Sequence, residues 1–294
     1  MDVSVVLCVY NGADTLAGSL RAIAAQSFPR ERYEVIVVDD GSTDDSARIA
    51  AEHGAQVLQQ AHRGHVAAKN LGWRSARGTW IAFTDDDCGP TRHWLALLRQ
   101  AVERGDDSGP ALGAAGRIAG YPSPLAVPRY VELTGGFNTE RHLQHPTFPF
   151  APGGNAMYRR EALAAVGGLD ERYSSYDMCE LHTRLRRTVG GAFHYEPRAV
   201  VFHHHYTDWR AFFRQQRGYG RGLAQFMLHH RDEAPWSAWR ELRAWGTVAG
   251  HGLAALRRGT DDAALRRHGD FVRQLALRVG FAETYFNRRE RGRW

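Results

Sequence analysis

Short apolar runs and longer amphipathic segments alternate through the first part of the chain. The apolar runs are rich in β-branched residues and end in turn-forming residues, which is typical of buried strands. They cover residues 3–10, 33–38, 55–58 and 80–84. Between them, apolar positions recur at helical spacing around residues 16–23, 43–52 and 65–77. This alternation predicts an α/β fold in which helices cover both faces of a mostly parallel sheet.

The pattern weakens in the middle of the chain and becomes helical towards its end. Residues 105–110 and 121–128 are rich in loop-forming residues, and residues 113–152 show little periodicity. GGNAMYRREALAAVGGLDERY predicts a strand, a turn and a helix. Another helix is expected at 177–187, and a last strand at 199–205. From Trp209 onward the pattern is helical and rich in Arg and Trp. We therefore expect two domains, an α/β domain at 1–205 and a helical region at 206–294.

Polar residues directly follow three of the predicted strands. In open sheets of this kind, ligands bind beyond the carboxyl ends of the strands. In extended chain, Asp85 and Asp87 point the same way because side chains alternate with period two. One carboxylate could hold Mg²⁺ or Mn²⁺, which prefer oxygen ligands, and the other could bind a ribose or a metal-bound water. The alternative is a solvated turn or a cap of the following helix.

The charge balance and the cysteines narrow the class of protein. Lys plus Arg exceed Asp plus Glu by 38 − 32 = 6, and such an excess favours anionic partners such as nucleotides or a membrane surface. We expect no nucleic-acid partner. Cys8, Cys88 and Cys179 are far apart and show neither a disulfide framework nor a zinc spacing, which indicates a reducing compartment.

The sequence shows neither a pattern typical of a signal peptide nor the common glycine-rich nucleotide-binding motifs. The first residues do not resemble a signal peptide, and no apolar run is long enough to span a bilayer. We therefore expect a cytoplasmic protein, either free or peripherally attached to the inner face of the membrane. G-x-G-x-x-G and G-x-x-x-x-G-K-[ST] are both absent, which argues against a dinucleotide-binding Rossmann site and a P-loop enzyme.

Four blocks of the sequence resemble family 2 glycosyltransferases with the GT-A fold. The blocks are VVLCVYNGADTLAGSLRAIAAQ, YEVIVVDDGSTDDS, GHVAAKNLGWRSARGTWIAFTDDD and GGNAMYRREALAAVGGLDERY, in that order. The resemblance implies a Rossmann-like GT-A domain that transfers a sugar with inversion of the configuration at its anomeric carbon. It also implies a nucleotide-diphosphate sugar as donor, a divalent metal such as Mn²⁺ or Mg²⁺, and an acceptor hydroxyl.

The resemblance assigns roles to residues near the strand ends. Cys8, Tyr10 and Asp14 would line the nucleotide pocket, Asp40 would bind the base, and Lys69 would lie nearby. Asp85 would face the ribose with Asp86 beside it, and Asp87 would hold the metal. Each has a plainer alternative: Tyr10 as a core aromatic, Asp40 in a helix-capping turn, and Cys8 as a packing residue.

Later residues would complete the site. Gly153, Gly154 and Asn155 resemble the stretch that shapes the acceptor side near the donor sugar, but a turn that requires glycine would look the same. His203 would complete the metal or diphosphate site, unless it is simply packed or exposed. Arg217 and Arg221, four residues apart on a helix, could clamp a diphosphate or form a solvated face.

The catalytic base is expected in YDMCELHTR. When this segment is aligned with the corresponding family helix on Glu180 and Arg184, Met178 falls at the family's catalytic position. Asp177 lies directly before it. Asp177 is therefore the predicted base. Glu180 is the alternative if the register slips by one residue, because a helix turns by about 100° per residue. A structural alternative also exists, in which Asp177 caps the helix and Glu180 lies three residues on.

These observations predict an inverting, metal-dependent glycosyltransferase with an unidentified acceptor, which could be a lipid-linked glycan, a polysaccharide, a natural product or a peptide. Two rivals remain: a sugar-phosphate nucleotidyltransferase, and a non-catalytic nucleotide-sugar or glycan-binding protein on the same fold, which Met178 motivates. Trp236, Trp239 and Trp245, interleaved with arginines in the tail, suit a membrane interface. Packing against the catalytic domain is the alternative.

Overall fold

The computed structural model describes residues 1–104, 110–257 and 259–287. Of the loop predicted at 105–110, only Pro110 lies within this part. The chain divides into two compact units. The first contains Met1–Ala119, Phe137–Glu171 and Asp177–His204, and the second contains Gly120–Gly136, Arg172–Tyr176 and the chain from His205 onward.

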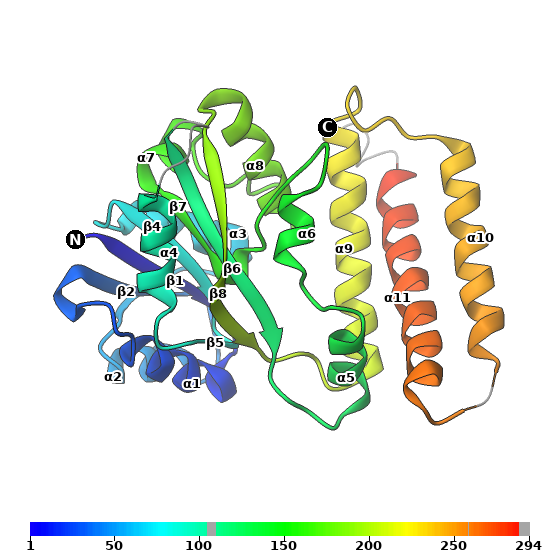
Figure 1. Cartoon of the computed structure of the whole chain (residues 1–294), viewed down its shortest axis with the longest axis horizontal. Helices are drawn as coiled ribbons and strands as arrows, with labels where there is room; N and C mark the ends of the chain where they lie inside the picture. Colours follow the sequence, from blue (N-terminus) through cyan, green and yellow to red (C-terminus); the bar gives the residue numbers. More distant parts are fainter. Residues whose placement is uncertain (105–109, 258, 288–294) are drawn as a thin grey trace. The chain divides into compact units, whose positions relative to one another are not determined.

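The described part of the first unit contains an eight-stranded sheet with the order β3-β2-β1-β4-β7-β6-β8-β5 (Figure 1). The first four strands pair in parallel, as the alternating pattern predicts. They are β1 (Val3–Val9), β2 (Tyr33–Asp39), β3 (Gln56–Gln59) and β4 (Trp80–Asp85). Their register sets Val9 beside Asp39 and Cys8 beside Asp85, so the polar residues that follow β1, β2 and β4 meet at one edge.

The other half of the sheet adds antiparallel pairs: β7 with β4, β6 with β7, and β5 with β8. These strands are β5 (Cys88–Pro90), β6 (Ala111–Gly120), β7 (Ala156–Arg159) and β8 (Ala192–His203). β6 is not predicted from the sequence, because this strand is largely Ala and Gly and has few of the branched and aromatic residues typical of strands. β8 begins before the predicted residue 199 and ends at His203, so His205 lies beyond it.

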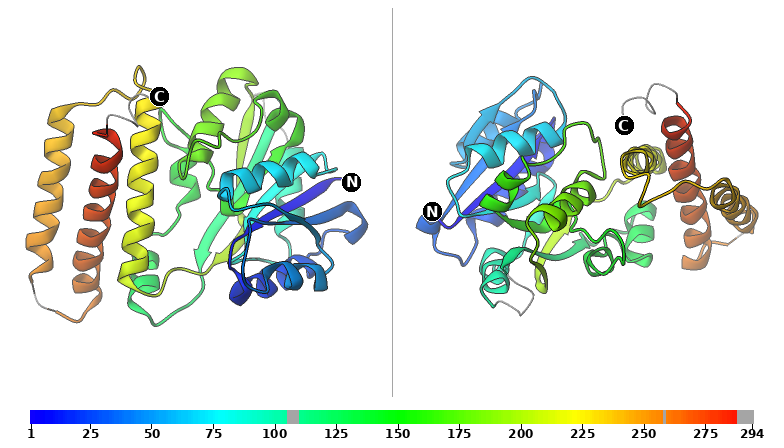
Figure 2. Two further views of the ribbon diagram at one scale, coloured as in Figure 1. Left: turned by 180° about the vertical axis from the view of Figure 1, so that it is seen from behind. Right: turned by 90° about the horizontal axis from the view of Figure 1, so that it is seen from above.

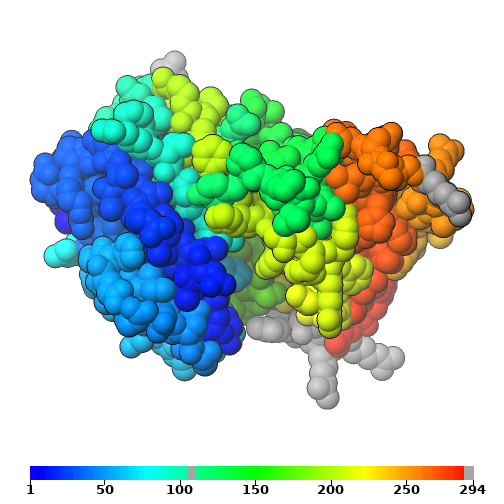
Figure 3. All heavy atoms as spheres, turned by 90° about the horizontal axis from the view of Figure 1, so that it is seen from below, coloured from blue at the N-terminus to red at the C-terminus, as the bar shows by residue number. Residues whose placement is uncertain are grey.

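Helices cover both faces of the sheet, because alternate strand residues point to opposite sides. Val5 and Leu7 of β1 pack into a core with α1 (Ala13–Ala24), α2 (Ser46–Glu52) and α4 (Trp94–Glu103). Val6 packs into a second core with α3 (His65–Ser75), α7 (Arg160–Ala165) and α8 (Asp177–Thr188). Figure 3 shows the blue N-terminal segments that include α1 and α2 side by side on the surface. Short elements complete this unit: η1 (Arg30–Arg32), α6 (Thr139–Leu143) and η2 (Gly153–Asn155).

The second unit is helical. Figure 2 shows its three long helices in one row with α11 in the middle. They are α9 (Trp209–His229), α10 (Ala238–Ala255) and α11 (Asp262–Tyr285), and the shorter α5 (Ala126–Leu133) also packs on α11. Glycines bring α9 and α11 together: a Cβ on Gly280 would lie 1.9 Å from the carbonyl oxygen of Arg217. Within the described residues, no helix combines the length and the apolar character needed to cross a membrane.

Candidate active site

The loops after β1 and β2 are joined by hydrogen bonds. The backbone N–H of Asn11 donates to Ser42 Oγ (2.9 Å), and that of Thr43 donates to Asn11 Oδ1 (2.8 Å). Asn11 has φ of 52°, a left-handed conformation that asparagine tolerates better than most residues. This anchoring holds Tyr10 at the sheet edge, where it is 49% exposed and stacks on His62 with ring centroids 4.0 Å apart. Tyr10 is thus an accessible aromatic surface, not a core residue.

Asp40 organises the loop that leads into α3. Its Oδ1 accepts hydrogen bonds from Gln60 Nε2 (2.6 Å) and from the backbone N–H of Arg63 (2.9 Å). Its Oδ2 accepts one from the backbone N–H of Gly64 (2.8 Å) and lies 2.9 Å from His62 Nδ1. Burial favours the neutral acid, but these hydrogen bonds outweigh it and lower the pKa of Asp40. An ionised carboxylate therefore sits beside the Tyr10–His62 stack.

Lys69 and Asp85 meet the backbone of the GGN stretch. A Cβ on Gly153 would lie 2.8 Å from Lys69 Nζ, and one on Gly154 would lie 2.9 Å from Asp85 Oδ2. The two glycines thus permit a close approach that larger residues would obstruct. Burial lowers the pKa of Lys69, but the charges of Asp85 and Asp177 outweigh it and raise the pKa. Lys69 therefore remains a buried cation next to carboxylates.

Asn155, by contrast, is a structural residue in the folded chain. It is fully buried, and its Oδ1 accepts a hydrogen bond from Trp94 Nε1 (2.7 Å). Its Nδ2 donates to the carbonyl oxygens of Arg117 (2.9 Å) and Ala199 (2.8 Å). These bonds tie η2 to β6, β8 and α4, so Asn155 fixes the position of the two glycines before it.

Asp86 points away from its neighbours, towards α1. Its Oδ2 lies 2.0 Å from the position that a Cβ on Gly12 would occupy, so a larger residue there would displace the carboxylate of Asp86. Burial and the charges of Asp87 and Asp85 raise the pKa of Asp86 to about 7. Of the other predicted pocket residues, Cys8 is half-buried at the edge of the second core, where burial raises its pKa, and Asp14 is exposed on α1.

Asp87, Cys88 and His203 form a cluster of candidate metal ligands. The pairing of β5 with β8 sets Cys88 opposite His203. His203 Nε2 lies 3.4 Å from Asp87 Oδ2, and Cys88 Sγ lies 3.6 Å from Asp87 Oδ1. One ligand atom from each of the three residues lies within 4.8 Å of the others. Burial and the charge of Asp85 raise the pKa of Asp87 to about 7, so a bound cation would stabilise its ionised form.

Asp177 begins α8 and faces His65, the first residue of α3. Asp177 is 6% exposed, and its Oδ1 lies 3.7 Å from His65 Nε2. Its Oδ2 is buried and has no hydrogen-bond partner among the described residues. Burial raises the pKa of Asp177, but His65 and the charge of Lys69 outweigh this and hold it well below its usual range. The preceding Tyr176 has φ of 63°, and such a conformation costs a non-glycine residue about 1–3 kcal/mol.

Glu180 has a different environment. It is fully buried, and both of its oxygens accept hydrogen bonds from Arg184, at 2.5 Å from Nε and 2.6 Å from Nη2. Arg184 also donates to the carbonyl oxygens of Val166 and Gly168, in the turn after α7. The pair thus joins α8 to that turn. Met178, at the position where the family has its usual catalytic Asp, is 5% exposed and packs into the second core.

Arg217 and Arg221 lie on α9 of the second unit. Both contact Glu283 of α11: Arg217 Nη2 lies 2.6 Å from Glu283 Oε1, and Arg221 Nη2 lies 3.1 Å from Oε2. In this structure the two guanidinium groups therefore connect α9 to α11.

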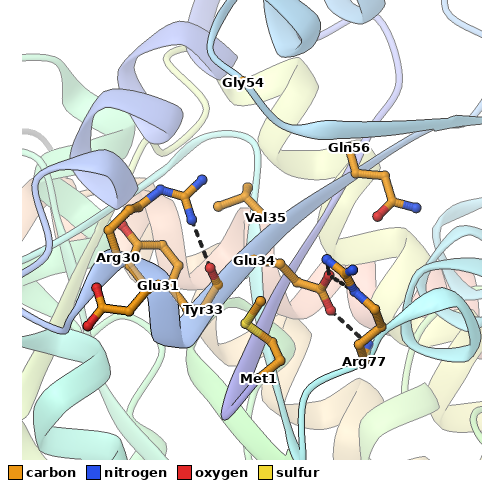
Figure 4. A pocket seen from close by; sticks show the side chains of 9 residues that line it. All are labelled: Met1, Arg30, Glu31, Tyr33, Glu34, Val35, Gly54, Gln56 and Arg77. Carbon is orange, nitrogen blue, oxygen red and sulfur yellow. Dashed lines mark hydrogen bonds and ion pairs between the residues drawn. The ribbon is translucent and has the colours of Figure 1, made fainter.

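A cavity of about 290 Å³ lies elsewhere on the first unit (Figure 4). It is lined by residues at the amino ends of the parallel strands, including Tyr33 and Gln56. Glu34 in its wall is hydrogen-bonded to Ser4 and ion-paired with Arg77. The cavity is therefore at the edge opposite to Asp85 and is not the candidate site.

Three residues of this site are not predicted from the sequence: His62, His65 and Cys88. A signal for His65 was present, because it precedes Lys69 by four residues and so shares its helical face. Cys88 directly follows the three aspartates, but its position opposite His203 depends on a strand pairing that sequence spacing does not reveal.

Comparisons with known proteins identify the family and the fold of the chain. The family model described as glycosyl transferase family 2 matches residues 4–167. The pre-mycofactocin glycosyltransferase of Mycobacterium tuberculosis is 31% identical over 243 residues, which cover 79% of this chain and 49% of that protein. Glycosyltransferase AglE of Haloferax volcanii is 36% identical over 99 residues, 32% of this chain and 33% of that protein. The chain thus spans about half the length of the first relative and a third of the second.

Two solved structures share the fold. A mannosyltransferase from Pyrobaculum calidifontis, in complex with GDP-Man and Mn²⁺, superposes with a TM-score of 0.62 at 20% identity, covering 97% of this chain and 86% of that one. TarS from S. aureus, in complex with UDP, gives 0.53 at 18% identity, covering 97% and 91%. At these identities the two structures show the fold alone. The family model, which matches more than half of the chain, places this protein in glycosyl transferase family 2.

Proposed function

We propose that the chain transfers a sugar from a nucleotide-diphosphate sugar to an acceptor hydroxyl, with inversion at the anomeric carbon. The observation that carries this proposal is the environment of Asp177. It is a buried carboxylate, held ionised by His65 and Lys69, with one oxygen lacking a hydrogen-bond partner among the described residues. Family membership and the nucleotide sugars named with structural neighbours support the same reaction.

The nucleoside part of the donor would bind at the carboxyl edge of β1, β2 and β4. The exposed ring of Tyr10 offers a stacking surface for a base, and Asp40 lies beside it. Asp85 would accept hydrogen bonds from the ribose, as acids after strands do in related folds. Lys69 would attract the negative charge of the donor, because it stays protonated in a buried position.

Asp87 and His203 would hold the divalent metal, Mn²⁺ or Mg²⁺. The Asp87 carboxylate is the kind of oxygen ligand that such a cation prefers, and His203 Nε2, 3.4 Å away, would add a nitrogen ligand. When bound, the metal would supply positive charge that stabilises the leaving diphosphate. Asp86 and Asp87 form a turn and not the extended chain expected from the sequence, and Asp85 at the end of β4 would remain available for the ribose.

Asp177 would act as the general base. It would take the proton of the acceptor hydroxyl while the acceptor oxygen forms a bond to the anomeric carbon and the bond to the diphosphate breaks. The low pKa keeps Asp177 ionised at neutral pH but reduces its basicity, so proton transfer has to accompany bond formation. Glu180 would position α8 through Arg184, because both of its oxygens already accept hydrogen bonds from this residue.

Asp87→Ala tests the donor and metal assignments. The 294-residue chain would be titrated with UDP and GDP, with and without Mn²⁺, by calorimetry. We expect the variant to lose most of the Mn²⁺-dependent affinity while its circular dichroism stays unchanged. Equal Mn²⁺-dependent affinity in the variant and the wild type would contradict the metal assignment.

Mass spectrometry of the products separates the proposed reaction from its rivals. Incubation with nucleotide sugars and Mn²⁺ should release nucleoside diphosphate from the cognate donor. Pyrophosphate formed from a nucleoside triphosphate and a sugar phosphate would indicate a nucleotidyltransferase. Donor that binds but stays intact, with and without candidate acceptors, would indicate a binding protein.

We also propose that α10 contacts an anionic membrane surface. α10 is the last helix of the row in Figure 2 and packs on α11. Large apolar side chains at or next to it are exposed: Trp239 (65%), Leu242 (63%), Leu253 (70%) and Leu256 (78%). At about 100° per residue they lie on one side of the helix. Trp236 is different, because it stacks on Tyr285 of α11 with ring centroids 5.8 Å apart.

The charges next to this apolar side favour lipid over a protein partner. Arg240 and Arg243 are exposed, and no acidic side chain in the described part of the chain pairs with either. Glu241, the acidic residue of α10, is buried and lies 3.3 Å from Arg278. Exposed Trp and Leu beside Arg is the arrangement of interfacial helices. Anionic lipids are a feature of the cytoplasmic leaflet, so this contact also fits the predicted location.

A further inference from the structure

The candidate metal site contains a sulfur ligand that Mn²⁺ and Mg²⁺ do not require. Cys88 Sγ, Asp87 and His203 Nε2 supply sulfur, oxygen and nitrogen, and the ligand atoms lie within 4.8 Å of one another. The antiparallel pair of β5 and β8 holds Cys88 opposite His203, so the juxtaposition is built into the sheet. The sulfur is thus part of the cluster and does not reach it by chance from a flexible loop.

This donor set matches another class of cation. Mg²⁺ and Mn²⁺ favour oxygen ligands, whereas Zn²⁺ is bound well by Cys, His and Asp together. Three protein ligands also leave one position of a tetrahedral zinc ion open, as in catalytic sites. Oxygen-seeking ions could use Asp87 and His203 and leave the thiol protonated, but a thiophilic ion would gain a third protein ligand.

Cys88 is buried beside the other two candidate ligands. The residue is 1% exposed, so its sulfur is shielded from solvent. Gly154 is its neighbour: a Cβ there would lie 3.7 Å from Sγ, in ordinary van der Waals contact. Within the described residues, neither Cys8 nor Cys179 belongs to a group of three possible metal ligands. Cys88 is therefore distinct from the other two cysteines.

We propose that Cys88 makes this a thiophilic cation site, at which Zn²⁺ is held jointly by Asp87, Cys88 and His203 and competes with Mn²⁺ and Mg²⁺. Binding exchanges the thiol proton, which is released to solvent, for a sulfur–metal bond, without any change of oxidation state. The inference rests on the metal site of the proposed function but not on the sugar-transfer reaction.

X-ray absorption at the zinc edge tests the proposal directly. The sample is the 294-residue chain with Cys8→Ser and Cys179→Ser, loaded with one equivalent of Zn²⁺, because Cys88 is then its one remaining cysteine. We expect one sulfur at about 2.3 Å together with nitrogen and oxygen ligands at about 2.0–2.2 Å. A first shell of nitrogen and oxygen only would overturn the proposal.

A competition measurement gives a second, independent readout. Displacement of Mn²⁺ by Zn²⁺ would be followed by the electron paramagnetic resonance of free Mn²⁺. Loss of a residue that only supports a metal ligand already lowers metal affinity by about 10–100-fold. Cys88→Ser removes a ligand itself and should therefore lower the affinity for Zn²⁺ by at least about 10-fold. Mn²⁺ affinity should change much less. Equal loss for both ions in a folded variant would contradict a specific sulfur ligand.

The same data separate failure of this inference from failure of the proposed function. If Mn²⁺ binds and enhances nucleotide affinity while Zn²⁺ shows no sulfur ligand, the thiophilic site is wrong and the proposed donor site stands. If neither cation binds, with or without nucleotide, both the sulfur ligand and the metal-dependent transferase are contradicted. If Cys88→Ser does not fold, the X-ray absorption spectrum of Cys8→Ser/Cys179→Ser still shows whether Cys88 binds Zn²⁺ through sulfur.

Discussion

His65 Nε2 lies 3.7 Å from Asp177 Oδ1, so the first residues of α3 and α8 face each other. Lys69 lies one helical turn beyond His65, and its charge also favours the ionised form of Asp177. Two elements far apart in the sequence thus hold one buried carboxylate ionised. Its second oxygen has no hydrogen-bond partner among the described residues, which leaves it able to accept a proton.

Asp177→Asn should reduce the transfer rate while leaving donor affinity close to that of the wild type. General-base catalysis typically contributes about 10²–10⁴-fold, so we expect a loss of roughly 10² or more. Single-turnover kinetics with saturating acceptor would measure the rate, and calorimetry the donor affinity. Full turnover in the variant would exclude Asp177 as the base.

Glu180→Gln is the matched comparison, and we expect its effect mainly on stability. The change removes the charge partner of Arg184 from a fully buried position, and breaking buried pairs costs about 3–5 kcal/mol. Arg184 is partly exposed, which places the expected loss at the low end of this range. Denaturant unfolding would measure it. An inactive Glu180→Gln protein of unchanged stability, beside an active Asp177→Asn protein, would make Glu180 the base.

Gly154→Ala should weaken donor binding more than it weakens the fold. The new Cβ would lie 2.9 Å from Asp85 Oδ2, and the carboxylate, as the end of a side chain, can move away. We expect lower nucleotide affinity with a small change in the midpoint of thermal unfolding. Gly18→Ala is the control, because a Cβ at Gly18 of α1 meets nothing within 4 Å. Similar affinity losses in both variants would contradict the close approach of Gly154 to Asp85.

Asp40 should contribute stability that depends on pH. Its folded-state pKa is lowered, so this contribution is complete above the unfolded pKa of about 3.9 and is lost as the pH falls through the folded value. Asp40→Asn removes hydrogen bonds to a charged acceptor, each worth about 1.5–3 kcal/mol, and should therefore destabilise the protein at pH 7. The difference in the free energy of unfolding between the variant and the wild type should become smaller below about pH 4. Urea unfolding of both proteins at pH 7 and below about pH 4 would measure their free energies of unfolding. A difference that does not change with pH would contradict the lowered pKa of Asp40.

Arg240→Glu/Arg243→Glu should reduce binding to anionic vesicles. Each basic residue near such a surface contributes about 1 kcal/mol, so losing two should lower partitioning by roughly 30-fold or more. Flotation with phosphatidylserine and phosphatidylcholine vesicles, at low and high salt, would measure this. Arg21→Glu/Arg92→Glu, an equal charge change at exposed sites of the first unit, is the control. No salt-sensitive flotation of the wild type would indicate that another protein segment covers α10.

The first half of the sheet and the residues at its edge can be predicted from local sequence patterns. β1, β2, β3 and β4 are found close to their predicted positions, because apolar β-branched runs between amphipathic segments carry their own local signal. The acids after β2 and β4 could be placed at one edge for the same reason, since parallel strands carry their carboxyl ends to the same side.

The positions of the other site residues depend on contacts between elements that are far apart in the sequence. β6, built largely from Ala and Gly, becomes a strand because small residues let it pack closely: a Cβ on Gly116 would lie 1.8 Å from the carbonyl oxygen of Ala199. Pairing between β5 and β8 brings Cys88 to His203, and the packing of α3 and α8 on one face of the sheet brings His65 to Asp177. Local patterns report which face of an element is apolar. They do not report which distant element packs against it, and in this protein the arrangement of the candidate base and of the metal ligands depends on those long-range contacts.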